Sequence, residues 1–249
     1  MPNPAPEHDI VVAAADALRA GFVELVRDLA RDAIAERGRF SLAVPGGSVA
    51  SVLLTGLGAH DVAWPSTDLF WCDERLVPPS HPDSNAGAAR AGWLRPLEPA
   101  GVRVHAMVAG DEDAEQAVER YTRTLAATLG TPPVLDLVVL GVGEDGHVGS
   151  IFPGHPALEE RDRWVVAVDD APKRPRQRVS LTLPAFTSAR CLVVAAFGIT
   201  KCDVMRCAIE EPTCLLPVAR TLRGATRAVV LLDDGAACGL SVFRRASGT

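Results

Sequence analysis

Residues 141–147, with the sequence GVGEDGH, follow an apolar run and place Asp145 two positions before His147. A neutral histidine is the usual general base near physiological pH, and an adjacent carboxylate can orient its ring. An isolated histidine would more simply be a surface residue without a role. The surrounding glycines, together with two further polar loops at residues 45–48 and 73–75, favour a general base at His147 with Asp145 beside it.

The same segment matches the pattern G-x-G-x-x-G that binds dinucleotides. That function requires a helix to begin within the glycines, whereas Pro153 and Pro156 would interrupt a helix here after about two turns. The segment also lies past the middle of the chain, while the dinucleotide pattern usually occupies the first strand-to-helix turn. A dinucleotide site is therefore only a minor alternative.

A second loop, Pro45-Gly46-Gly47-Ser48, follows an apolar run and precedes an expected helix. Gly46 and Gly47 allow the backbone to approach an anion, which the N–H groups at a helix start would attract. Ser48 could donate its hydroxyl or act as the N-cap of the helix. The alternative is an ordinary strand-to-helix turn with a capping serine.

A third loop begins with Asp73-Glu74-Arg75, directly after an expected buried strand. Three charges at that point are costly unless they pair or bind a ligand. Arg75 could hold a phosphate with two parallel hydrogen bonds. The turn-forming residues that follow indicate a new helix starting at Ser84 or Asn85. The alternative is a structural ion pair at a sheet edge.

Lysine is rare in this chain: 23 of the 25 basic residues are arginine, and the two lysines are Lys173 and Lys201. Lys173 lies in the segment PKRPRQR, which also contains Arg178, and Lys201 follows another expected strand. Both lysines could contact a phosphate as point charges. The alternatives are a solvated basic loop for the first and an exposed helix lysine for the second.

The elements that position these loops can be predicted from apolar periodicity. Helical spacing covers residues 14–36, with Gly38 ending the helix, and also residues 49–57 and 113–129. Continuous apolar runs predict strands at residues 40–44, 69–72, 135–140, 165–168, 191–196 and 228–232, with a helix between the last two. Such strands alternating with helices indicate a mainly parallel sheet covered on both faces, in a single α/β domain over residues 1–249. The three polar loops follow strand ends, where such sheets bind ligands.

The whole-chain properties exclude several classes of protein. A net charge of −6 argues against a nucleic-acid-binding surface, and no apolar stretch approaches the length that crosses a membrane. The N-terminal residues do not resemble a signal peptide. The six cysteines form no metal or disulfide pattern, so we expect reduced, mostly buried thiols in the cytoplasm. His147 and His155 do not form a convincing metal pair.

Taken in order, five segments resemble the 6-phosphogluconolactonase family: LAVPGGS, FWCDERLVPPSHPDSNAG, LDLVVLGVGEDGHVGSIFPGHP, APKRPRQRVSLTLP and GITK. The resemblance implies a Rossmann-like three-layer fold shared with glucosamine-6-phosphate deaminases and ribose-5-phosphate isomerases. It also implies hydrolysis of 6-phosphogluconolactone, the second step of the oxidative pentose phosphate pathway. Two departures, Val49-Ala50 and Val148-Gly149 where the family often has Thr-Pro and Thr-Ala, affect fine substrate preference rather than the reaction.

The resemblance further implies roles for individual residues. His147 is the expected general base, with Asp145 beside it, and neither a cofactor nor a metal is expected. The expected substrate and phosphate contacts are Gly46, Gly47, Ser48, Asp73, Arg75, Asn85, Lys201, Arg178 and Lys173. The expected partner is a phosphorylated sugar lactone, not a nucleic acid or a membrane, and the expected state is a cytoplasmic monomer or weak homodimer.

Two other functions fit parts of the sequence. An amino-sugar phosphate deaminase on the same fold would release ammonia, but the PKRPRQR segment followed by SLTLP favours the lactonase. A non-catalytic sugar-phosphate sensor would need an attached DNA-binding module, and about 40 residues before the first strand loop leave no evident room for one. Retention of both Asp145 and His147 also favours catalysis.

Overall fold

The computed structural model describes residues 8–241. Its strands are β1 (His8–Val12), β2 (Phe40–Val44), β3 (Thr67–Trp71), β4 (Asp73–Arg75), β5 (Arg103–Val104), β6 (Leu137–Gly141), β7 (Val165–Val168), β8 (Arg178–Leu181), β9 (Cys191–Ala196) and β10 (Ala228–Leu232). Its α-helices are α1 (Ala15–Arg37), α2 (Gly47–Leu53), α3 (Asn85–Ala91), α4 (Ala114–Leu129), α5 (Leu183–Thr187), α6 (Cys202–Glu210), α7 (Pro217–Gly224) and α8 (Asp234–Ala237). Short 3-10 turns lie at Leu54–Gly56, Trp64–Ser66, Pro156–Glu159 and Ile199–Lys201.

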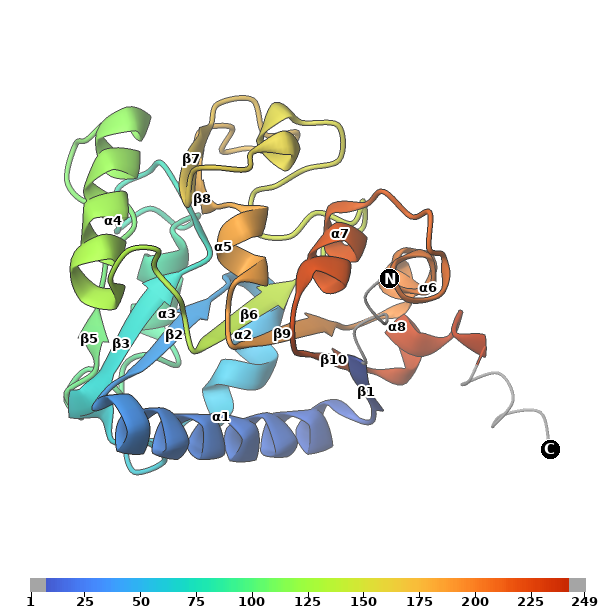
Figure 1. The fold of residues 1–249 in the computed structure, drawn as a ribbon, viewed down its shortest axis with the longest axis horizontal. Helices are drawn as coiled ribbons and strands as arrows, with labels where there is room; N and C mark the ends of the chain where they lie inside the picture. The colour runs from blue at the N-terminus through green and yellow to red at the C-terminus, as the bar shows by residue number, and fades with distance from the viewer. Residues whose placement is uncertain (1–7, 242–249) are drawn as a thin grey trace.

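Within residues 8–241, seven parallel strands form the main sheet in the order β1-β10-β9-β6-β2-β3-β5. Helices α1 and α2 lie on one side of it, and α5 and α7 lie on the other (Figure 1). Strands β2, β3, β9 and β10 are buried along their whole length. This confirms the expected α/β fold, because only a strand covered on both faces is buried along its whole length.

The ends of two helices show why the sequence forms them there. Gly38 takes a left-handed conformation, with φ of 74°, and its N–H bonds to the carbonyl of Ile34, which ends α1. Asp113 caps α4: its side chain accepts from the N–H of Gln116, whose own side chain accepts from the N–H of Asp113. Both expected helices are confirmed to within about one residue.

A smaller antiparallel sheet, in the order β4-β8-β7, lies beyond the carboxyl end of β3. It packs beside α4 and above the main sheet (Figure 1). Only β7 was predicted from the sequence, because β4 and the start of β8 are polar. In β4, alternate side chains point to opposite faces, so Asp73 and Arg75 share one face while Glu74 occupies the other.

Three local expectations are wrong. Ser48 does not cap α2, because the helix already begins at Gly47 and no side chain bonds at that cap. Two α-helices, α6 and α7, rather than one, separate β9 from β10. The six cysteines are not all reduced: disulfides join Cys202 to Cys238 and Cys207 to Cys214.

The other two cysteines, Cys72 and Cys191, are free and buried, as expected. The disulfides escaped prediction because their spacings of 36 and 7 residues match no framework pattern, and the fold alone brings each pair together. Across residues 8–241, no helix is long and apolar enough to cross a membrane.

Candidate active site

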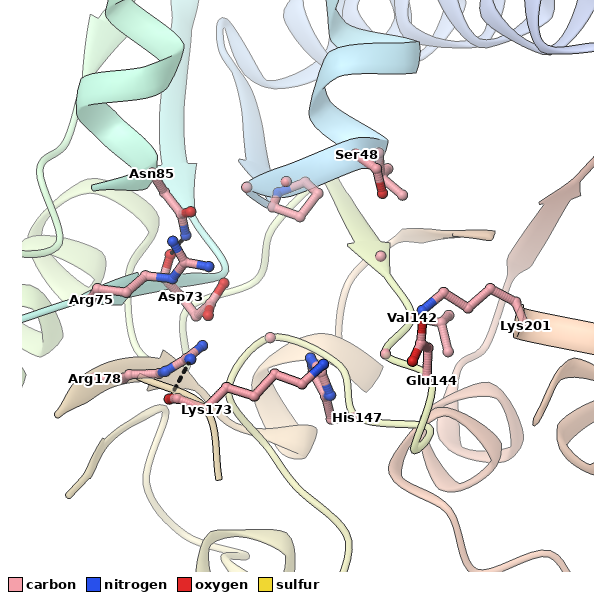
Figure 2. A pocket seen from close by; sticks show the side chains of 17 residues that line it. Ser48, Asp73, Arg75, Asn85, Val142, Glu144, His147, Lys173, Arg178 and Lys201 are labelled. Carbon is pink, nitrogen blue, oxygen red and sulfur yellow. Dashed lines mark hydrogen bonds between the residues drawn. The ribbon is translucent and has the colours of Figure 1, made fainter. Parts of the chain in front are cut away.

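The three polar loops meet in one cleft of about 230 Å³ at the carboxyl edge of the main sheet (Figure 2). This position follows from the topology, because β2, β3 and β6 are neighbouring parallel strands whose ends share one edge. The residues predicted from the sequence that line the cleft are Gly46, Gly47, Ser48, Asp73, Arg75, Asn85, His147, Lys173, Arg178 and Lys201. Asp145 does not line it and instead supports His147.

His147 is held by two contacts with Asp145. Its Nδ1 lies 2.5 Å from Asp145 Oδ1, and its backbone N–H donates to the same oxygen at 3.2 Å. The ring also packs against Phe152, with 4.7 Å between ring centroids. Because Nδ1 faces the carboxylate, Nε2 is the nitrogen left to exchange a proton with a ligand in the cleft.

The glycines around this pair are required by its geometry. A Cβ on Gly143 would lie 2.0 Å from His147 Nδ1 and 2.6 Å from Asp145 Oδ1. Gly146 takes a left-handed conformation with φ of 84°. No helix starts in this loop, which instead forms isolated bridges from Val148 to Val142 and to Ile151. The dinucleotide alternative therefore lacks the helix it needs.

The environment of Asp145 keeps its carboxylate charged. Burial would raise its pKa, but the charge of His147 and the hydrogen bonds from that residue outweigh burial and lower the pKa of Asp145 below its ordinary value. An ionised carboxylate fixes the proton of His147 on Nδ1 and can stabilise the imidazolium that forms during proton transfer. Such an arrangement of an ionised carboxylate and an oriented imidazole can perform general-base catalysis.

The three charges of residues 73–75 have different roles. Glu74 is 3% exposed and accepts hydrogen bonds from the N–H groups of Asn85 and Ala86, each at 2.8 Å, so it anchors the start of α3. Burial raises the pKa of Glu74, and those hydrogen bonds oppose the rise. Asp73 accepts from Ser150 Oγ at 2.6 Å and its carbonyl accepts from the Asn85 amide at 2.9 Å. Glu74 is therefore structural through hydrogen bonds to backbone N–H groups, not through the ion pair considered as the alternative, whereas Asp73 and Arg75 face the cleft.

Arg75 and Arg178 bring two incompletely paired guanidinium groups to the cleft. Arg75 donates from Nη1 to the carbonyl of Asp83 at 2.6 Å, while its Nε is buried without a hydrogen-bond partner in the described chain. Arg178 is 5% exposed and donates only to the carbonyls of Pro175 and Lys173, each at 3.0 Å. Neither forms an ion pair within residues 8–241. A buried and a half-buried cation without a carboxylate partner favour an anionic ligand.

The two lysines enter the cleft from different elements. Lys173 extends toward His147, while Lys201 approaches from the 3-10 turn before α6, beside Glu144 and Val142 (Figure 2). Burial lowers the pKa of Lys201, and the charge of Glu144 opposes that shift. Glu144 lines the cleft but was not predicted as a site residue. Its place next to Asp145 in the glycine loop was the signal that could have identified it.

The PGGS loop brings its backbone close to α3. A Cβ on Gly46 would lie 1.9 Å from Asn85 Oδ1, so only glycine allows Asn85 its position. Gly47 takes a left-handed conformation with φ of 68°. Ser48 is exposed at the start of α2, with its hydroxyl beside the cleft (Figure 2). The loop therefore presents backbone and hydroxyl groups to a ligand without capping the helix through a side chain.

The donor set does not resemble a metal centre. His155, the other histidine considered as a metal ligand, bonds through Nε2 to Asp170 at 2.7 Å and through Nδ1 to the N–H of Ala157. Over residues 8–241, no three His, Cys, Asp or Glu side chains gather in a way that could hold a metal ion. The cleft instead combines four cations, one histidine and glycine-rich backbone.

A family model described as glucosamine-6-phosphate isomerases/6-phosphogluconolactonase matches residues 13–230. The chain belongs to this family. A 6-phosphogluconolactonase of Rattus norvegicus is 38% identical to it over 250 residues, which covers 97% of each chain. A solved structure of 6-phosphogluconolactonase from Trypanosoma brucei is 28% identical, with a TM-score of 0.81, and covers 94% of this chain and 99% of that one.

A solved structure whose name indicates a different chemistry shares the fold. A monomeric glucosamine-6-phosphate deaminase gives a TM-score of 0.74 over 93% of this chain and 99% of its own, at 17% identity. That identity shows a shared fold and nothing about the reaction. The expected relationship with deaminases is thus confirmed for the architecture.

Proposed function

We propose that this protein hydrolyses 6-phospho-D-glucono-1,5-lactone to 6-phosphogluconate, the second step of the oxidative pentose phosphate pathway. The observation that carries the proposal is the His147–Asp145 pair at the edge of a cleft lined by four cations. The names of relatives that are 36–38% identical over 94–97% of this chain support the same reaction. A deaminase function is not favoured.

The proposed mechanism begins with binding of the phosphate. The Gly46–Ser48 loop, Arg75 and Lys201 hold it, and Arg178 adds a buried positive charge. Asp73 and Asn85 lie beside these groups and contact sugar hydroxyls. Holding the phosphate fixes the lactone relative to His147, which converts the attack of water into a reaction within one complex.

His147 then acts as base and acid in turn. Its Nε2 takes a proton from water, and the hydroxide attacks the C1 carbonyl to form a tetrahedral oxyanion. The N–H groups of Gly143 and Gly146 are already bonded to carbonyls in their own loop, so the Lys173 ammonium, which points toward His147, is better placed to stabilise that charge. The protonated ring returns its proton to the ring oxygen as the C1–O bond breaks.

The test is acid release from freshly generated 6-phosphogluconolactone, measured above the spontaneous rate. We expect the wild type to exceed that background clearly, and His147→Ala to lower kcat by roughly 10²- to 10⁴-fold with little change in KM. A fully active His147→Ala enzyme would refute the assignment of the base. A wild type no faster than the background would refute the lactonase function, and ammonia release from glucosamine 6-phosphate would then be measured.

We further propose a cytoplasmic enzyme that acts as a single domain and as a monomer or weak homodimer. The substrate class supports the location alone, since phosphorylated sugars are intracellular metabolites that do not cross membranes unaided. Cell fractionation and light scattering of the purified protein over a range of concentrations test these statements. A stable tetramer or a secreted protein would contradict them.

A further inference from the structure

Two disulfides cross-link the part of the chain that carries Lys201. The first joins Cys202, at the start of α6, to Cys238, which follows α8. The second joins Cys207 to Cys214 across the end of α6. Cys202 is the immediate neighbour of Lys201, so the first disulfide lies one residue from a cation of the cleft.

The turn that presents Lys201 is attached to α8 at both of its ends. At its start, the N–H of Gly198 donates to both carboxylate oxygens of Asp233 at 2.9 Å, and Asp233 also caps α8. At its end, the Cys202–Cys238 disulfide joins it to the residue after that helix. Between them the packing is tight, since a Cβ on Gly235 would lie 2.9 Å from the N of Ile199. Among these described contacts between the turn and α8, the disulfide is the covalent one, and the others are hydrogen bonds and packing.

The Cys202–Cys238 disulfide is open to chemical attack. Both cysteines are half-buried, and the neighbouring Ile199 is 64% exposed. A thiolate at Cys202 would be stabilised by the start of α6, which makes its sulfur a good leaving group. In a cytoplasmic protein, disulfides are usually transient, catalytic or redox-sensing rather than permanent.

We propose that the Cys202–Cys238 disulfide is a reversible redox modification site that sets substrate affinity through Lys201. The proposal rests on the proposed function, because it assigns Lys201 to the phosphate of the lactone. Reduction removes the covalent link between Cys202 and Cys238, so that only hydrogen bonds and packing hold the turn against α8, and Lys201 must then be ordered when the substrate binds. A small-molecule disulfide, which accepts the two electrons and two protons through the same exchange in reverse, re-forms the Cys202–Cys238 bond and restores the preformed cation.

The reductant is a dithiol. One of its thiolates attacks a sulfur of the disulfide, forming a mixed disulfide and freeing the other cysteine as a thiolate. The second thiol of the reductant then displaces the bound cysteine. Two electrons and two protons pass to the protein, which gains two thiols, and the reductant leaves as its own disulfide.

The experiment compares kcat and KM of the oxidised protein and of the protein treated with dithiothreitol, with free thiols counted by alkylation and mass. Ordering one long side chain on binding corresponds to roughly a 2- to 10-fold loss of affinity. We therefore expect reduction to raise KM by that factor, with little change in kcat, and reoxidation to reverse it.

Two double variants locate the response. The variant Cys202→Ser with Cys238→Ser should have the KM of the reduced wild type both with and without dithiothreitol. Cys207→Ser with Cys214→Ser removes a disulfide from the same helix and should keep the response. Circular dichroism of each variant checks folding. The comparison of oxidised and reduced wild type tests the proposal even if a variant fails to fold.

Two results would overturn the proposal. One is an unchanged KM in wild-type protein whose four disulfide-forming cysteines are shown by mass to be reduced. The other is a response that survives in the Cys202→Ser/Cys238→Ser variant. An oxidised wild type without lactonase activity would instead refute the proposed function, and the affinity for 6-phosphogluconate in both redox states would then test the disulfide.

Discussion

Asp145 and His147 are in direct contact, and we propose that the histidine exchanges the proton while the aspartate positions it. We expect Asp145→Asn to lower kcat by roughly 10- to 100-fold, less than the full contribution of a general base. The reason is that the amide no longer holds the ring proton on Nδ1, which nitrogen NMR of the imidazole would show as a changed tautomer ratio. The chain offers a matched control, Asp170→Asn, which removes the partner of His155 outside the cleft.

Asp170→Asn should leave kcat unchanged. If both substitutions lowered kcat equally, the effect would come from general destabilisation, and the positioning role of Asp145 would be lost. An altered kcat in Asp145→Asn without any change in the tautomer ratio would also contradict that positioning role.

Arg178 is the cation that the structure most clearly leaves available for a ligand. Burial lowers the pKa of its guanidinium group, and its partners are backbone carbonyls rather than carboxylates. We expect Arg178→Met to raise KM for the phosphorylated lactone by roughly 10- to 100-fold. This factor corresponds to the binding free energy lost with one hydrogen bond to a charged group. The exposed Arg176, two residues earlier, provides the control Arg176→Met, with little change expected.

The comparison needs a second substrate. Hydrolysis of unphosphorylated gluconolactone should be slow in the wild type and should not fall further in Arg178→Met. An equal loss with both lactones would mean that Arg178 supports the fold of the cleft rather than the phosphate.

At the scale of elements, apolar strands were predictable and polar ones were not. Strands β7, β9 and β10 match the predicted residues 165–168, 191–196 and 228–232. Each is a continuous apolar run, and such a run is itself the signal for a buried strand. Strand β4 pairs with β8 across about a hundred residues of chain, and no local pattern contains that pairing.

The same limit applies to the site. The sequence grouped Asp73, Glu74 and Arg75 as three adjacent charges, but it could not show that they form a strand. Once they do, alternation turns Glu74 toward α3 and the other two toward the cleft. The motif residues were therefore predictable as a group, while their separate roles depended on tertiary structure.

The glycine loop between β6 and His147 should tolerate no side chain at Gly143. A Cβ there would contact both members of the catalytic pair, so Gly143→Ala must separate Asp145 from His147. We expect kcat to fall by about tenfold or more while the fold is retained, since the loop lies at the edge of the core. Gly21→Ala in α1 meets no atom within 4 Å and should raise stability by up to about 1 kcal/mol without altering kcat.

A Gly143→Ala enzyme with normal kcat would show that Asp145 and His147 can move apart without loss of activity. That result would contradict the proposed need for their close contact. Unfolding of Gly143→Ala, measured by thermal denaturation, would instead place the glycine among the requirements of the fold.

At the scale of the whole molecule, the end of β3 away from the cleft has a charge cluster around the buried Asp68, which we expect to contribute to stability. Asp68 is 2% exposed and accepts hydrogen bonds from Arg103, at 2.8 and 3.0 Å, and contacts His105 Nε2 at 2.8 Å. The cluster joins β3 to β5, the strand at the edge of the main sheet. It lies outside the cleft, so its effect on stability can be separated from catalysis.

The pH dependence of stability should report on Asp68. Burial would raise its pKa, but hydrogen bonds and charges of Arg103 and His105 outweigh burial and lower it below 3.8, the ordinary value. The unfolded chain therefore binds a proton first as pH falls, so the contribution of Asp68 to stability is present above pH 3.8 and is lost below it.

In urea unfolding, Asp68→Asn should lower the free energy of unfolding by roughly 1–3 kcal/mol at pH 7. That difference from wild type should shrink below pH 4, whereas the exposed Asp16→Asn should differ little throughout. A difference that stays constant to pH 3 would show that Asp68 acts through packing rather than charge.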